Sequence, residues 1–211
     1  MKAFFSLAAA FTLAVTLLSI QPAVAADSVK AMEAYKAVLQ NNMTFYNTND
    51  QKHYKLSEFD YWGEDSYLPL KVVSFAVVDM DGDGVPEVIL ELTSGFDGSF
   101  EVLHYEDGQV YGFNHPYRGI IDLTSDGIYW GSDGAADGGF YKASISKSRY
   151  ETTALGYSES AADESVTHYI DGTKVSDAQY NEFLEKMWAH ARENKAVWYD
   201  FIDSNIASAF K

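Results

Sequence analysis

The order of apolar and polar residues predicts helices near both ends of the chain. Over residues 28–42, apolar side chains recur every three or four positions, which is the period of a helix with one buried face. Ser176 and Gln179 form a capping-box pair and an apolar stripe follows over 180–191, so a second helix is expected to start at Ser176. We expect the aromatic and apolar segment 197–210 to form a last short helix.

The middle of the chain has the pattern of antiparallel strands joined by short turns. Residues 72–78 are almost continuously apolar, as in a strand that is covered on both faces. Asp-Gly, a favoured pair in two-residue hairpin turns, recurs between the later strand-like segments. Residues 56–70 have no clear period and are expected to form a loop with a short helix. We therefore expect an α+β fold, in which N- and C-terminal helices pack on one antiparallel β-meander sheet. The expected strands are 44–46, 53–55, 72–78, 88–92, 101–105, 109–113, 120–123, 128–130, 141–145, 150–155, 166–170 and 174–175.

Residues 1–26 have the features of a bacterial signal peptide. A positively charged start is followed by an uncharged apolar stretch over 3–20, and small residues at its end have the spacing that a signal peptidase recognises. We expect cleavage before Ala26 or Asp27, a single mature domain over 27–211 and no transmembrane segment after cleavage. The protein is then secreted or extracytoplasmic. The alternative is an uncleaved membrane anchor, because the apolar run approaches the length of a membrane span.

Composition and charge exclude several classes of function. The chain has 31 acidic and 15 basic residues and a formal net charge of -16, so it should repel phosphate backbones and bind no nucleic acid. Cysteine is absent, which excludes disulfides, cysteine nucleophiles and thiolate metal sites. The histidines His104, His115 and His168 lie far apart in the sequence, without the spacing of a zinc motif. These exclusions still allow a site in which oxygen atoms bind a hard cation, and the acidic composition favours such a site.

The stretch 79–87, DMDGDGVPE, has the pattern of a calcium loop. Asp79, Asp81 and Asp83 occupy alternate positions, from which their carboxylates converge on one point when the chain coils around a cation. Val85 offers a backbone carbonyl, and Glu87 offers a carboxylate that ligates directly or through water. The alternatives are Mg²⁺ in the same loop, or an acidic hairpin turn that binds no ion.

This stretch resembles two families of calcium loop. The stretch resembles an EF-hand loop as far as Leu90, which stands where that loop places a bidentate Glu, and strands rather than helices are expected on both sides. The pattern D-x-D-G-D-G-x-x-[DE] is closer to the loops of integrin-type FG-GAP repeats, which join strands around calcium. That resemblance implies Asp79, Asp81, Asp83 and Glu87 as side-chain ligands and Val85 as a carbonyl ligand. Because the chain has one such loop, the propeller of the FG-GAP family is not implied.

A wider resemblance involves exported proteins of Gram-positive anaerobes. They share D-[LM]-D-G-D-G-V-P-E at 79–87, L-H-Y-x-x-G-x-V-Y-G at 103–112 and G-A-A-D at 134–137. The similarity implies a shared fold, but it implies no known activity.

We therefore expect an exported calcium-binding domain in which the ion is structural and the role is non-enzymatic, binding an extracellular carbohydrate or protein ligand. The alternative is an extracellular hydrolase that acts on polymers and has a structural calcium. No nucleophile elbow G-x-S-x-G occurs, although a catalytic triad assembled from distant residues is still an alternative.

The acidic, Gly-rich segment 132–139 is expected to be a surface loop, with a second cation or ligand site as its alternative. Aromatic residues near turns are candidates for ligand stacking: Tyr111, Tyr117, Tyr129 and Trp130.

Overall fold

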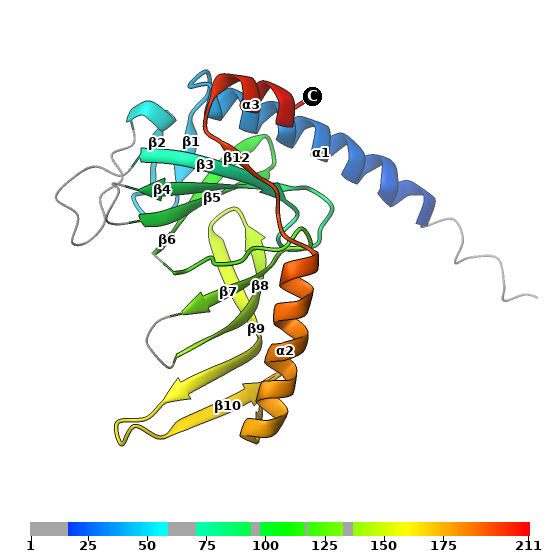
Figure 1. The fold of residues 1–211 in the computed structure, drawn as a ribbon. Helices are drawn as coiled ribbons and strands as arrows, with labels where there is room; N and C mark the ends of the chain where they lie inside the picture. The colour runs from blue at the N-terminus through cyan, green and yellow to red at the C-terminus, as the bar shows by residue number, and fades with distance from the viewer. Residues whose placement is uncertain (1–16, 59–70, 94–97, 117, 133–136) are drawn as a thin grey trace, which may run out of the picture.

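The computed structural model describes residues 17–58, 71–93, 98–116, 118–132 and 137–211, and their side chains from Val24 onward (Figure 1). The described chain has α-helices near both ends and strands between them, in the order that the sequence predicts. The helices are α1 (Leu17–Leu39), α2 (Asp177–Glu193) and α3 (Asp203–Ala209), with a 3-10 helix at Leu56–Glu58. None of the described helices combines the length and apolar character that a bilayer crossing requires.

A seven-stranded sheet forms the upper half of the molecule in Figure 1, and α1 and α3 lie over one of its faces. The strand order is β12-β3-β4-β5-β6-β1-β2. All neighbouring pairs are antiparallel except β1 and β6, which run parallel. The strands are β1 (Phe45–Asn47), β2 (Lys52–Tyr54), β3 (Lys71–Val78), β4 (Glu87–Thr93), β5 (Gly98–Glu106), β6 (Gln109–Pro116) and β12 (Trp198–Asp200).

A five-stranded antiparallel sheet forms the lower half, and α2 runs along one of its sides (Figure 1). Its order is β11-β10-β9-β8-β7. Ser176 caps α2 through the predicted capping box with Gln179, which satisfies amide groups at the start of the helix. The strands are β7 (Ile128–Ser132), β8 (Gly138–Ser146), β9 (Arg149–Ser160), β10 (Val166–Ile170) and β11 (Thr173–Val175).

Two apolar clusters hold these layers together. The first lies between the large sheet and the helices α1 and α3, with Tyr35, Phe75 and Ile206 among its buried members. The second lies where the other face of the large sheet meets the small one, and it contains Met80 and Tyr129. Because both faces of β3 and β4 are covered, their sequences are nearly continuous apolar runs, as the sequence analysis predicted.

The α+β class, the terminal helices and the antiparallel hairpins are confirmed, and three details differ. The strands form two sheets rather than one, because β6 leads into a segment that turns away to start β7. Within 197–210, expected to be helical, Trp198–Asp200 pairs with β3 before α3 begins. Residues 120–123 form only an isolated bridge between Ile121 and Trp130. The expected loop over 56–70 begins with the 3-10 helix, and residues 59–70 lie outside the described part.

The predicted signal peptide is described only at its end. Residues 1–16 lie outside the described part of the chain, and α1 runs from Leu17 through the predicted cleavage position to Leu39. The helix expected over 28–42 is therefore present but starts earlier and stops three residues sooner.

Candidate metal centre

The acidic loop joins the ends of β3 and β4, where Val78 pairs with Glu87. Gly82 and Gly84 have φ angles of +80° and +89°, in the left-handed region that favours glycine. These two residues let the chain coil tightly between two strands. The strand-to-strand setting agrees with the sequence prediction and differs from the helical flanks of an EF-hand.

The carboxylates of the loop turn inward and accept hydrogen bonds from its own backbone. Asp79 accepts from the amides of Gly82 and Gly84, at 2.7 and 3.0 Å. Asp81 accepts from the amide of Asp83 at 3.1 Å, and Asp83 accepts from the amide of Val85 at 2.7 Å. Carboxylate oxygens of Asp79, Asp81 and Asp83 lie within 4.8 Å of one another. The structure thus brings together the three aspartates that the sequence predicted as ligands.

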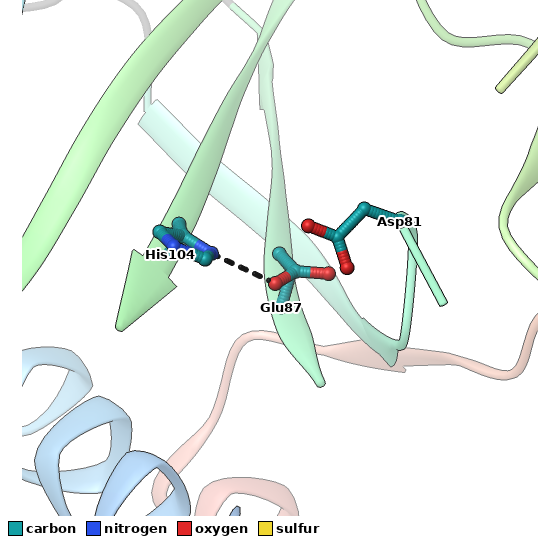
Figure 2. A group of neighbouring side chains, drawn as sticks. All are labelled: Asp81, Glu87 and His104. Atoms are coloured by element: carbon teal, nitrogen blue, oxygen red, sulfur yellow. Dashed lines mark hydrogen bonds and ion pairs between the residues drawn. The ribbon is translucent and has the colours of Figure 1, made fainter. Parts of the chain in front are cut away.

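Glu87, the fourth predicted side-chain ligand, lies beneath the loop and is fully buried. Its Oε2 accepts from the amide of Met80 at 2.8 Å, and its Oε1 lies 3.0 Å from Nδ1 of His104. Figure 2 shows this pair, with the carboxylate of Asp81 turned toward Glu87. Asp81, Glu87 and His104 form a second group whose possible ligand atoms lie within 4.8 Å of one another.

The sequence analysis did not identify His104 as a neighbour of the acidic loop. The β4–β5 pairing, in which Val88 lies opposite Leu103, carries His104 to the end of β4 beside Glu87. Sequence spacing does not reveal this, because 17 positions separate the two residues. The apolar pattern of β4 and β5 predicted that both strands exist. It did not predict their register, on which the contact between His104 and Glu87 depends.

Burial and charge shift the pKa values in this group. Burial raises the pKa of Glu87 to about 7. Burial alone would lower the pKa of His104, but the hydrogen bond and negative charge of Glu87 outweigh it, so this pKa is raised. Partial burial is the main cause that raises the pKa of Asp83, and the negative charges of Asp81 and Asp79 raise it further. Glu87 and His104 therefore favour a shared proton, while the aspartates repel one another.

The two groups suit different metals. The three aspartates offer oxygen alone, which hard cations such as Ca²⁺ and Mg²⁺ prefer. Oxygens bound to one Ca²⁺ at about 2.4 Å cannot lie more than about 4.8 Å apart, and the aspartate oxygens satisfy this limit. The group with His104 adds an imidazole nitrogen, which suits transition metals better than calcium. Val85 lies in the loop with its side chain buried.

The loop also touches three other parts of the molecule. Asp81 Oδ2 accepts from the amide of Ile145 in β8 at 3.3 Å. A Cβ atom on Gly127 would lie 2.6 Å from Met80, so the backbone of the 126–127 turn rests directly on the loop. A Cβ atom on Gly84 would lie 2.7 Å from Val24 of α1. The acidic loop therefore lies where the small sheet and α1 meet the large sheet.

The three described aromatic residues of those that the sequence singled out do not form an exposed cluster. Tyr129 is buried, and Trp130 packs on Trp188 of α2 with ring centroids 5.2 Å apart. Tyr111 lies on the large sheet with its ring 6.1 Å from that of Tyr46. Tyr117 lies outside the described residues.

The segment 132–139 is only partly a loop. Ser132 ends β7, and Gly138 and Gly139 begin β8, while residues 133–136 lie outside the described part. The amide of Ser160 donates to Asp137 Oδ1 at 2.5 Å. Asp137 thus lies near the ends of β8 and β9.

Comparison of the chain with protein-family models, characterised proteins and solved structures finds no significant match. The resemblance to calcium loops therefore rests on the residues of the loop itself.

Proposed function

We propose that this protein is an exported calcium-binding protein, in which the ion is structural and the role is to bind a ligand outside the cell. The observation that carries the metal proposal is the convergence of the Asp79, Asp81 and Asp83 carboxylates in a loop between two buried strands. Glu87, with the carbonyl of Val85, remains a candidate to complete the set.

Electrostatic repulsion supports a bound cation. Three carboxylates this close repel one another by an amount on the order of a few kcal/mol. The loop amides offset part of that repulsion, because Asp79 and Asp83 accept hydrogen bonds at 2.7 Å. A divalent cation would convert the rest into attraction, and the pKa of Asp83 would fall from its raised position.

The contacts of the loop support a structural role for the ion. The loop meets β8 through Ile145 and meets the 126–127 turn through Met80, so ordering it would tie the small sheet to the large one. Ligands that come from one tightly coiled segment also leave few positions for a substrate. We therefore expect calcium to raise stability rather than to supply a reaction centre.

The proposal of export and of a binding role rests on the sequence. The signal-peptide pattern of residues 1–26 supports secretion. Neither the described residues nor the chain sequence provides a nucleophile motif, so we place ligand binding ahead of hydrolysis.

Calcium titration of the exported protein tests the metal proposal. At calcium one hundredfold above Kd, the free energy of unfolding should increase by about 2.7 kcal/mol, and the melting temperature should rise with it. Asp79→Asn and Asp83→Asn should abolish the shift. Asp126→Asn, which removes an exposed aspartate of the adjacent turn, is the matched control and should keep it. Identical melting curves with calcium and with EDTA would refute a structural calcium.

Parallel titrations with Mg²⁺ and Mn²⁺ separate the two ligand groups. Calcium binding at the aspartates should survive His104→Gln, because His104 is not among them. A preference for Mn²⁺ that His104→Gln removes would instead place the ion between Asp81, Glu87 and His104.

A further inference from the structure

The small sheet has one face covered by α2, and its opposite face packs on the large sheet around Tyr129 but is open near Tyr157. Phe140 of β8 lies under the helix, with its ring centroid 4.8 Å from that of Trp188 and 6.4 Å from that of Phe183. Gly156 of β9 also lies against the Phe183 ring. Because neighbouring residues of a strand point to opposite faces, Tyr141 and Tyr157 point away from α2.

Tyrosine rings line this open face on three adjacent strands. Tyr157 of β9 and Tyr169 of β10 are cross-strand partners, and their rings stack with centroids 4.8 Å apart and an interplanar angle of 14°. Tyr141 of β8 lies on the other side of Tyr157, and all three side chains are partly buried. The sheet therefore presents a short row of aromatic surfaces.

Two paired glycines lie against the tyrosine side chains. Gly131 of β7 lies opposite Gly139 of β8. A Cβ atom on Gly131 would lie 3.2 Å from the Tyr141 ring, and one on Gly139 would lie 2.6 Å from Cβ of Tyr157. Larger residues at these positions would displace the tyrosines, so the glycines allow the rings to lie close to the backbone.

Beside these rings lies a slot with a volume of about 470 Å³, to which Gly138 also contributes. The side chains of Tyr141 and Tyr157 line it, and Asp137, Glu159 and Ser160 provide a polar rim. A second hollow of about 200 Å³ lies where the end of β6 meets the small sheet, and His115, Tyr129 and Tyr141 are among its lining residues. Tyr141 lines both hollows.

We propose that this face binds neutral sugar units of an extracellular polysaccharide. A sugar ring presents flat C–H surfaces, which pack on aromatic faces, and equatorial hydroxyl groups, which donate to carboxylates at the edge. The slot has both kinds of partner, in a volume large enough for one or two sugar rings.

Charge decides which polysaccharides fit. Asp137 and Glu159 lie at the rim, and the whole chain has a net charge of -16, so uronate-rich or phosphate-rich polymers are repelled. A purely apolar peptide would offer no donor to the two rim carboxylates. Neutral glycans are therefore the ligand class that matches both the rings and the rim. This inference names the ligand of the binding role proposed above, but it does not depend on the calcium loop.

Affinity electrophoresis of the exported protein in native gels tests the inference. The gels contain a soluble neutral polysaccharide, in turn xyloglucan, arabinoxylan, galactomannan and mixed-linkage β-glucan, or polygalacturonate as the anionic comparison. We expect retardation in at least one neutral gel and none in polygalacturonate. Tyr157→Ala and Tyr141→Ala should weaken binding by about tenfold or more, because each removes a stacking surface. Tyr157→Phe keeps the ring and should bind within about twofold of the parent.

Controls separate loss of the site from loss of the fold. Tyr46→Ala removes a tyrosine of the large sheet and should bind glycans as the parent does. Each variant is also unfolded in urea, because a cooperative transition like that of the parent shows that the sheets are formed, and the parent is titrated with calcium in parallel. Normal migration in every neutral gel overturns the inference, whatever the calcium result. So does binding that survives both tyrosine-to-alanine changes, or retardation in polygalacturonate alone. A lost calcium response with intact, tyrosine-dependent glycan binding would instead refute only the metal proposal.

Discussion

Nδ1 of His104 lies 3.0 Å from Oε1 of Glu87, and both side chains are buried at the end of the β4–β5 ladder. Oε2 of Glu87 in turn accepts from the amide of Met80, at the start of the acidic loop. The pair therefore connects the interior of the large sheet to the backbone of the candidate metal loop. A buried pair of this kind is costly to break, because each partner compensates the desolvation of the other.

We predict that Glu87→Gln and His104→Gln each lower the free energy of unfolding by about 3–5 kcal/mol. The double variant should lose less than the sum of the single losses, because no unpaired charge remains. Urea denaturation of all four proteins measures the coupling. Asp126→Asn is the matched control: Asp126 also lies 3.0 Å from a histidine, His190, but this pair is partly exposed and should contribute less than about 1 kcal/mol. Additive losses would contradict the assigned pairing.

The contact between the 126–127 turn and the metal loop predicts unequal effects of two similar substitutions. Gly127 and Gly108 both follow aspartate and have φ angles of +81° and +85°. Alanine at either position should cost about 1 kcal/mol in backbone strain. At Gly127 its Cβ would also lie 2.6 Å from the Met80 backbone, whereas at Gly108 nothing lies within 4 Å. Gly127→Ala should therefore cost about 3 kcal/mol or more and weaken calcium binding, and Gly108→Ala should leave calcium binding unchanged. Equal losses in urea denaturation would argue against the contact.

Glu101 predicts a pH dependence of stability. Its carboxylate is fully buried in β5; Oε1 accepts from Asn47 at 3.2 Å, and Oε2 has no hydrogen-bond partner among the described residues. Burial raises the pKa of Glu101 from 4.5 to about 8. A raised pKa means that the folded state holds the proton more tightly, so the contribution of Glu101 is complete below pH 4.5 and is lost as pH rises through about 8.

Glu101→Gln should therefore gain stability relative to the parent between pH 5 and pH 8, by at most about 1.4 kcal/mol per pH unit. Urea denaturation at several pH values measures the difference. Glu182→Gln is the control: Glu182 is exposed on α2, and its hydrogen bond to Lys186 lowers its pKa, so this variant should not gain stability as pH rises. A difference between Glu101→Gln and the parent that stays constant with pH would show that Glu101 ionises normally.

The processing of the N-terminus is a separate prediction. The mass of the exported protein should correspond to a chain that starts at Ala26 or Asp27, because the small residues there satisfy signal peptidase. Replacing Ala25 and Ala26 by leucine should leave the precursor uncut. Val24, which lies against Gly84 of the acidic loop, would be removed by cleavage. Recovery of an intact Met1 form from the membrane fraction would support the anchor alternative.

The sequence by itself predicted the elements that depend on local physics. Capping of α2 by Ser176, the Asp-Gly turns and the coil of the acidic loop each involve residues a few positions apart. Alternating aspartates with glycines between them determine much of the geometry of such a loop, and the carboxylates of Asp79, Asp81 and Asp83 lie within 4.8 Å of one another. The signal peptide and the identity of the ion stay predictions from sequence.

Tertiary structure decided everything that depends on strand register and on which faces meet. His104 reaches Glu87 only because β4 and β5 pair with Val88 opposite Leu103, and a shift of one residue would turn His104 to the other face. The division into two sheets, the burial of Tyr129 and the row formed by Tyr141, Tyr157 and Tyr169 arise in the same way. Local sequence contains the period of each strand but not its partner, since the choice of partner depends on burying apolar surface across the whole molecule.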